Sequence, residues 1–478
     1  MSEDLFRLHH TENGHQGQED ADMRRIDASL RLPTIILFSN AIHWLVVAAL
    51  LSVVLSVKLV FPGFLGGIGF LSYGRLAPTT RDLMLYGWAT QASLAAGIWL
   101  MTRLCRRPLG GILLNTLIIC ATVLWNLAVL LGSLAILAGY STGVEWLEYP
   151  NWASAMLFLS FLLIGIWALL LFDRRASGHP EVAQWYLVAG FCSFPWVYGT
   201  ANLLLTWRPI QASAQGPIQS WFCGALLTLW LLTVSVAALY ALLPRILGSR
   251  LHRRDLATLG FWMFLLLGSW SGMDRLIGGP VPAWMTSAGV VSGILFVIPV
   301  TIIAINLTGI LRRGPNRNGF RPVYRFLTMG LFSLLALGVL EAISSIPCIS
   351  GTLNLTGFSE AKYQLCILGA VSFPLFGVLY EALPGLIGRD CWCKALTNRH
   401  YWLAVAGLWL LFGLMILEGF FTGLALIDPT VTFLNITSYS YPFHLLECVA
   451  QLVLLAATVT LGINLTVALA GDYLFPKR

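Results

Sequence analysis

Residues 70–104 read FLSYGRLAPTTRDLMLYGWATQASLAAGIWLMTRL. The first part of this stretch is polar, with Arg75 and Arg81, and the part from Asp82 onward is apolar. That apolar run is long enough to cross about 30 Å of hydrocarbon at 1.5 Å per residue. Similar runs follow one another along the whole chain, so the sequence predicts an all-α membrane protein of twelve transmembrane helices. The predicted spans are 34–58, 82–104, 111–138, 151–173, 181–206, 216–243, 255–277, 284–311, 323–346, 361–387, 400–425 and 441–470.

Composition agrees with this prediction. Of the 478 residues, 57% are hydrophobic and 11% are charged, whereas a soluble domain has about 25% charged residues. A water-soluble globule is therefore excluded, and twelve spans leave no room for a folded extramembrane domain. We expect a disordered cytoplasmic tail over residues 1–32, one transmembrane domain over 33–470 and a short cytoplasmic C-terminus over 471–478. The first 32 residues have no apolar core of the kind that marks a signal peptide.

The formal net charge of +7 has an ordinary explanation in a membrane protein, because Lys and Arg collect in cytoplasmic loops. If the N-terminus is cytoplasmic, the outer segments hold few of the 29 Lys and Arg residues. We therefore expect both termini in the cytoplasm, the lipid bilayer as surroundings, and no nucleic-acid partner. The basic residues in the outer segments are Lys58, Arg75, Arg81, Arg208, Arg275 and Lys362.

The cysteines and glycines carry no recognisable site. Nine cysteines are scattered along the chain, and the close pair Cys391 and Cys393 has no second pair to complete a zinc site. The glycines around Gly63 and Gly66 do not follow a strand, as a dinucleotide-binding loop would require, so we interpret them as turn residues.

The stretch quoted first also carries a family resemblance. In the catalytic subunit of cbb3-type haem-copper oxidases, the second helix begins Gly-Arg-Leu-Arg-Pro-Leu-His-Thr-Asn and continues Gly-Trp-Ala-Thr-Gln. The residues of this chain that match at the same spacing are Gly74, Arg75, Leu76, Pro78, Gly87, Trp88, Ala89, Thr90 and Gln91.

Further similarities follow in chain order. His179, Val182, Ala183 and Trp185 resemble the family's His-x-x-Val-Ala-x-Trp before the fifth helix, and others lie at Leu243–Arg245, Trp270, Gly369 and Gly419. The resemblance implies a subunit I-like bundle of twelve helices in a bacterial-type inner membrane. It also implies haem and copper as cofactors and a place in the respiratory chain.

The resemblance fails at the ligands, because low-spin haem takes two imidazoles, high-spin haem one and copper three. The family's second-helix histidine falls on Thr80, and the sixth-helix copper ligand falls on Gly224. We therefore predict a divergent member that has no catalytic, cofactor-binding or metal-binding residues of the family type. The remaining ligand positions fall on Asp274 and Arg275 in the seventh helix and on Leu365 and Ile367 in the tenth.

Other histidines cannot take over these roles. The chain has eight, and only His43 and His444 lie in predicted spans away from the inner loops and the tail. His444 is expected to hydrogen-bond Glu447 at the interface, and His43 to be a packing residue. A single haem held by His43 and another donor is the alternative.

Ionisable residues inside the spans are costly unless they are paired or hydrated. Asp274 and Arg275 could form an ion pair that fills a vacated metal pocket, and Glu341 resembles an acidic residue near the family's haem pocket. A polar or proton-relay role is the alternative to a purely structural one for this set: Asp274, Arg275, Glu341, Glu381, Glu418 and Glu447.

Three functions follow. The first is a non-catalytic structural subunit of a respiratory membrane complex, which would bind other membrane subunits such as cytochrome-bearing proteins. The second is an active terminal oxidase or nitric-oxide reductase that receives electrons from cytochrome c, although the missing ligands argue against activity. The third is a protein that conducts protons or a solute through the vacated pocket.

Overall fold

The structure, a computed structural model, describes residues 2–108, 110–176, 178–249, 251, 253–313, 322–354 and 356–474. Within these ranges the chain is helical with turns and loops and contains no strand. Eleven helical segments are long and apolar enough to cross a membrane, by length and composition. The all-α membrane fold predicted from the sequence is therefore confirmed at this level.

The helices follow the predicted spans closely. Several spans are composite, because α-helical parts are joined without a break through π-helical parts. In order, the elements are α1 (Ser2–Val60), η1 (Gly69–Leu71), α2 (Tyr73–Asp82), η2 (Leu83–Thr90), α3 (Gln91–Cys105), α4 (Ile112–Ala138), α5 (Asn151–Asp173), α6 (Val182–Asn202), η3 (Leu203–Trp207), α7 (Ala212–Ala225), η4 (Leu226–Leu232), α8 (Thr233–Leu247), α9 (Arg254–Gly268), η5 (Met273–Leu276), α10 (Ala283–Leu295), α11 (Val297–Arg313), α12 (Pro322–Ser344), α13 (Pro347–Leu353), α14 (Gly357–Gln364), η6 (Leu365–Val371), α15 (Ser372–Ile387), α16 (Lys394–Ile427) and α17 (Phe433–Leu474).

The span predicted at residues 82–104 is not among the eleven segments. Its residues lie in α2, η2 and α3, which run without interruption from Tyr73 to Cys105. Thr90, Gln91 and Ser93 lower the apolar character in the middle of this helix, although the 18 residues after Asp82 carry no charge. The twelfth crossing remains a prediction.

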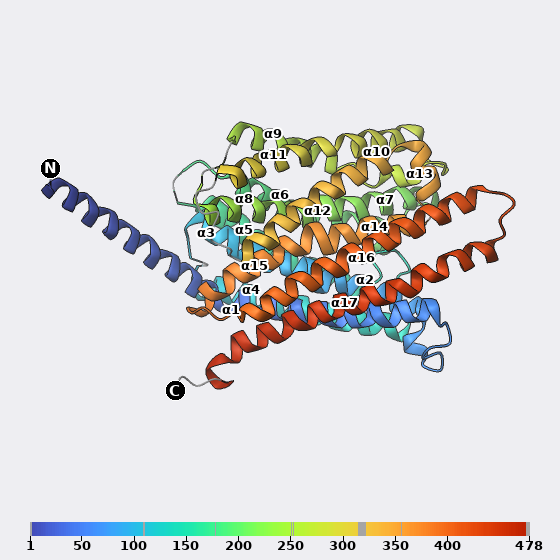
Figure 1. Ribbon diagram of the computed structural model, residues 1–478, viewed down its shortest axis with the longest axis horizontal. Coiled ribbons are helices and arrows are strands. Elements are labelled where there is room, and N and C mark those ends of the chain that lie inside the picture. The colour runs from blue at the N-terminus through green and yellow to red at the C-terminus, as the bar shows by residue number, and fades with distance from the viewer. Residues whose placement is uncertain are drawn as a thin grey trace.

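The helices run side by side in one elongated bundle, and α16 and α17 form a long hairpin on one side of it (Figure 1). Three composite helices are buried on nearly all sides. In Tyr73–Cys105 every residue from 82 to 102 is buried. In the most apolar stretch of 18 residues, 94% is buried inside the bundle for Ala212–Leu247 and 89% for Gly357–Ile387. In each of the other segments of membrane length, less than half of the corresponding stretch is buried. These three helices therefore form the centre, and each contains a π-helical part, a distortion that is frequent at functional sites.

Aromatic side chains fill much of the core beside the central helices. The rings of Phe161 and Phe194 stack with centroids 3.9 Å apart, and Trp230 of η4 meets Phe161 edge to face at 4.8 Å. All three side chains are completely buried. Such packing leaves little free volume in this part of the bundle.

The predicted boundary of the N-terminal tail at residue 32 is wrong. The structure describes side chains from residue 21 onward, and these already belong to the helical bundle. From residue 21 onward, α1 already packs against the bundle: Ile26 and Leu30 are buried, and the Asp27 carboxylate is bound by Arg103 through two contacts of 2.9 and 2.6 Å. The boundary was misplaced because the sequence there is polar overall, although its few apolar residues share one face of the helix. At the other end, α17 continues to Leu474, and residues 475–478 lie outside the described ranges.

Candidate functional site

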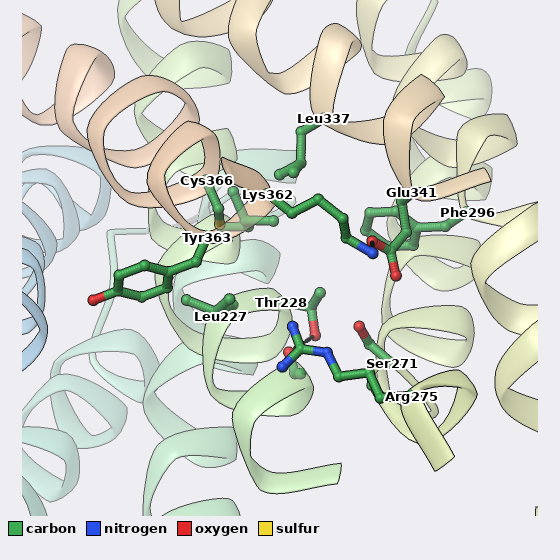
Figure 2. Close-up of a pocket in the computed structure, with 13 residues that line it drawn as sticks. Leu227, Thr228, Ser271, Arg275, Phe296, Leu337, Glu341, Lys362, Tyr363 and Cys366 are labelled. Atoms are coloured by element: carbon green, nitrogen blue, oxygen red, sulfur yellow. Dashed lines mark hydrogen bonds and ion pairs between the residues drawn. The ribbon is translucent and has the colours of Figure 1, made fainter. Parts of the chain in front are cut away.

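A small cavity lies between two of the central helices, Ala212–Leu247 and Gly357–Ile387. Its volume is about 40 Å³, which suits a few water molecules. The lining comes from α7, η4, η5, α12, α14 and η6, and so joins helices that are far apart in the sequence (Figure 2). The lining residues include Gly224, Thr228, Ser271, Arg275, Glu341, Lys362, Tyr363 and Cys366.

One wall of the cavity is a close backbone contact. A Cβ added at Gly224 would overlap the carbonyl oxygen of Ser271, and one added at Gly272 would overlap the carbonyl oxygen of Ser220. Gly272 also has a φ of +90°, which disfavours any other residue. Helix α9 ends at Gly268, and the chain turns here before η5. Glycine is therefore required on both sides of this contact, at Gly224 and at Gly272, because neither position has space for a side chain.

Asp274 lies in η5 directly after this turn and is buried. Its Oδ2 atom accepts a hydrogen bond of 3.2 Å from the Ser345 hydroxyl, which lies just beyond α12. The predicted ion pair between Asp274 and its neighbour Arg275 is not among the ion pairs of the described residues.

The cavity's ion pair joins Glu341 and Lys362 instead. Lys362 Nζ lies 2.7 Å from Glu341 Oε2 and donates a second bond of 2.7 Å to the Ser344 hydroxyl. The Ser344 hydroxyl in turn donates to the Glu341 carbonyl oxygen at 3.2 Å. A buried charge is tolerable only when it is paired in this way, so α12 and α14 are bound together by this contact.

Arg275 extends its guanidinium into the cavity, facing Leu227 and Thr228 (Figure 2). Within the described residues, no carboxylate lies at ion-pair distance from it, and its side chain makes no hydrogen bond. The Thr228 hydroxyl is committed to carbonyl oxygens of Gly224 and Gly268, at 2.9 Å each. The cavity thus holds a fixed cation beside a neutralised ion pair.

The other acidic residues singled out from the sequence lie elsewhere. Glu418 accepts bonds of 2.9 Å from Thr422 and from Ser440, across the α16 and α17 hairpin. Glu381 lies near the end of α15, about 9 Å along the helix from its last residue, while Glu418 lies about 36 Å into α16. These two carboxylates are therefore not neighbours. The predicted pair of His444 and Glu447 is confirmed, with Nδ1 and Oε2 3.2 Å apart.

One predicted low-spin haem ligand position, Thr80, lies at a second, larger cavity of about 300 Å³. Thr80 lines it, and its hydroxyl donates to the Leu76 carbonyl oxygen at 2.7 Å. Leu365 and Ile367 are completely buried in η6 and do not line it. Polar side chains along its wall include Ser52, Arg81, Glu360, Gln364, Glu447 and Gln451.

Few side chains in this region could bind a metal ion. Within the described ranges, no three His, Cys, Asp or Glu side chains are grouped so that they could hold a metal ion. Of the residues lining the smaller cavity, Tyr363 and Cys366 are of types that can ligate haem iron. The Tyr363 hydroxyl points away from the cavity (Figure 2), whereas Cys366 is a buried free thiol.

Sequence reasoning missed two parts of this region. Lys362 was counted among the basic residues of the outer segments although the predicted span begins at residue 361, and it is buried in α14. The second part is an acidic cluster around Arg81, whose Nη1 contacts Glu145 at 2.8 Å and whose Nη2 lies 3.9 Å from Glu148. Asp82 beside it is completely buried. The spacing of Glu145 and Glu148 in a short loop was the available signal.

Comparisons with known proteins agree on one family. The family model described as cytochrome C and quinol oxidase polypeptide I matches residues 33–457. The chain is 22% identical to a cytochrome c oxidase subunit 1 homolog of Agrobacterium tumefaciens, over 90% of this chain and 82% of the relative. It is 21% identical to the cbb3-type cytochrome c oxidase subunit CcoN1 of Stutzerimonas stutzeri, over 88% and 91%.

A solved structure has the same fold. It is a heme-copper terminal oxidase dimer, with a TM-score of 0.71 and 13% sequence identity, and the match covers 94% of this chain and 84% of the other.

Proposed function

Because this chain belongs to the cytochrome C and quinol oxidase polypeptide I family, we propose that it is a non-catalytic, subunit I-like member that has lost the ligands for haem and copper. It keeps the helical frame and serves as a structural subunit of a respiratory membrane complex in a bacterial-type inner membrane. The names of the two bacterial relatives described above, a cytochrome c oxidase subunit 1 homolog and a cbb3-type cytochrome c oxidase subunit, support the assignment of membrane and pathway.

The contact between Gly224 and Ser271 carries this proposal. Gly224 aligns with a copper-ligating histidine of the family, and its Cα faces a backbone carbonyl that leaves no space for a Cβ. A histidine could return to this position only if residues 269–272 moved. The loss is thus supported by the packing of two segments as well as by one substitution.

The lining and the volume of the cavity support the same conclusion. Neither a carboxylate bound by serine nor one paired with lysine is the imidazole that haem iron and copper take in this family, and arginine cannot lose its proton to become a ligand. A volume of about 40 Å³ is also far below the roughly 300–1,000 Å³ of pockets that hold small organic ligands. The residues that line this smaller cavity do not fit a high-spin haem or copper.

The decisive experiment is a cofactor measurement on the whole complex. We would purify the chain in mild detergent with whatever copurifies, then measure haem by the pyridine haemochrome spectrum and copper by elemental analysis, per mole of this chain. We expect neither above background once haem carried by partner subunits is subtracted. The Cys366→Ser variant tests the remaining sulfur donor and should leave the spectrum unchanged.

Stoichiometric haem and copper bound to this chain would overturn the proposal and restore an active oxidase. Haem that disappears in Cys366→Ser would point to a haem protein with thiolate ligation, which would overturn it as well.

A second candidate is proton conduction, which the unpaired Arg275 and the neighbouring charges favour. In liposomes, conduction through this cavity would give a proton flux that Lys362→Met abolishes and that an exposed control, Lys394→Met, does not change.

A further inference from the structure

The second cavity, at Thr80, is a slot between helices from both ends of the chain. Its volume is about 300 Å³, which reaches the range of about 300–1,000 Å³ found for pockets that hold small organic ligands. Residues of α1, α2, η2, α14, η6, α16 and α17 line it. Along α1 the lining runs from Leu45 to Leu59, about 21 Å of helix. The slot therefore extends along the helix axes.

The deep end of the slot is apolar. Leu45 lies about 22 Å from the end of α1, and Leu368 lies about 16 Å from the start of α14. The hydroxyls of Ser52 and Thr458 each donate to a carbonyl oxygen of their own helix at 2.9 Å, so their protons are already used. Further apolar lining comes from Ala49, Met84, Met415 and Leu454.

The other end of the slot is acidic. Tyr73 is the first residue of α2 and Glu360 the fourth of α14. This end of the bundle lies opposite the first part of α1 (Figure 1) and is the predicted outer side. Glu360 and Glu447 are the acidic side chains among the described residues of the lining, and Arg81 is the cationic one. The slot therefore changes from charged to apolar along its length.

Negative charge is in excess around Arg81. Its guanidinium contacts Glu145 at 2.8 Å and lies 3.9 Å from Glu148. The Glu360 carboxylate is also close enough to interact with the same charge. Three carboxylates therefore share one guanidinium. A single cation cannot neutralise three anions, so the outer end of the slot attracts a further positive charge.

The carboxylates that line the slot have weak partners. Glu360 accepts a bond of 2.8 Å from the Gln364 amide, which carries no charge. Glu447 has the His444 ring 3.2 Å away, which is charged only when protonated. Between them, the Tyr363 hydroxyl has no hydrogen-bond partner among the described residues, although Tyr363 is only 4% exposed. This hydroxyl points away from the smaller cavity, and its residue also lines the slot (Figure 2).

We propose that this slot binds an amphipathic organic cation, with an ammonium group beside Glu360 and Glu447 and an alkyl tail at the apolar end. The rings of Tyr73 and Tyr363 add aromatic faces, which attract ammonium groups. An inorganic cation would leave the apolar end unoccupied, and an anionic amphiphile would meet like charges. The inference rests on the proposed function, because a haem held at the position of Thr80 would occupy the same space.

The test compares three amphiphiles with the same eight-carbon tail. The purified chain is reconstituted in phosphatidylcholine nanodiscs and titrated with octyltrimethylammonium, octyl glucoside or octanesulfonate in a calorimeter, and the heat from empty nanodiscs is subtracted. We expect the cation to bind with a Kd at least tenfold lower than that of the neutral or the anionic compound. Butyltrimethylammonium, whose tail is too short to reach the apolar end, should bind at least tenfold more weakly than the octyl compound.

Variants separate the two ends of the slot. Glu360→Gln/Glu447→Gln keeps the size of both side chains and should weaken binding of octyltrimethylammonium at least tenfold. Ala49→Leu adds volume at the apolar end and should weaken the octyl compound several-fold while leaving the butyl compound unchanged. Asp428→Asn is the matched control, because Asp428 is an exposed acidic residue at the tip of the α16 and α17 hairpin and does not line the slot. It should bind as the wild type does.

Two outcomes would overturn the inference. One is equal binding of octyl glucoside or octanesulfonate and the cation; the other is equal binding of the cation by Glu360→Gln/Glu447→Gln and Asp428→Asn. The haemochrome spectrum of the same sample keeps these failures apart from a failure of the proposed function. If the sample contains no haem and shows no preference for the cation, this inference alone is wrong. One haem per chain would overturn the proposed function and this inference with it.

Discussion

The ion pair of Glu341 and Lys362 is the residue-scale feature with the largest expected effect on stability. Both side chains are mostly buried, so removing one partner leaves an uncompensated charge. We expect Lys362→Met to destabilise the protein by about 3 kcal/mol. In the double variant Glu341→Gln/Lys362→Met, where both charges are gone, much of that loss should be recovered. Thermal unfolding in detergent measures both, with the exposed Lys394→Met as control, and equal losses in the single and double variants would contradict this account.

Glu148 gives a prediction about pH. It lies in the loop between α4 and α5, and burial raises the pKa of its carboxyl group, against the opposing charge of Arg81. A raised pKa in the folded state means that folding favours the protonated form. The resulting stability is fully present below the ordinary glutamate pKa of about 4.3 and is lost as pH rises through the higher folded value. The melting temperature of Glu148→Gln should therefore fall less over this window than that of the wild type; parallel curves would contradict the assignment.

At this scale the sequence predicted the kinds of residue better than their pairing. Asp274, Arg275 and Glu341 were recognised as charges inside spans, and the structure brings all three to one region. Their partners, Ser345 and Lys362, come from segments some 70 and 20 residues away. No periodicity within a single helix reports which faces of separate helices meet, so the actual ion pair could not be derived.

The break between α9 and η5 is the feature to test at the scale of the elements. Gly224→Ala should destabilise the protein by about 1–3 kcal/mol, because the added methyl group meets the Ser271 carbonyl in a closely packed contact. Gly413→Ala is the matched control, since Gly413 lies inside α16 with open space around its Cα. That change should be neutral or stabilise by up to about 1 kcal/mol, through helix propensity. If both variants had the same melting temperature, the close contact would not be real.

The elements themselves were predictable because apolar runs of membrane length dominate the sequence. Their composite character was not. Apolar periodicity does not distinguish the π-helical parts η4 and η6 from α-helix, and the turn at Gly268–Gly272 interrupts a run that composition alone predicts as one span. The start of α1 was placed too late for a related reason: Ile26 and Leu30 contribute one buried face within a polar sequence.

At the scale of the whole molecule, the arrangement in the membrane is the main prediction left to test. Two observations bear on the number of crossings. Eleven helical segments satisfy the length and composition of a span, and Tyr73–Cys105 forms one more continuous helix, packed among them. An odd number of crossings would place the termini on opposite sides, whereas twelve would place both on the side that the basic loops mark as cytoplasmic.

Fusions to reporters distinguish these two arrangements. With twelve crossings, green fluorescent protein attached after Arg478 should fluoresce, because it folds on the cytoplasmic side. Alkaline phosphatase inserted in the loop after α4, at Thr142 or Gly143, should be active, because it requires the outer side; the same enzyme inserted after α3, at Arg107, should be inactive. Since α2, η2 and α3 separate the loop after α1 from Arg107, phosphatase activity at Arg107 would mean that this helix does not cross. The chain would then have eleven spans with its termini on opposite sides.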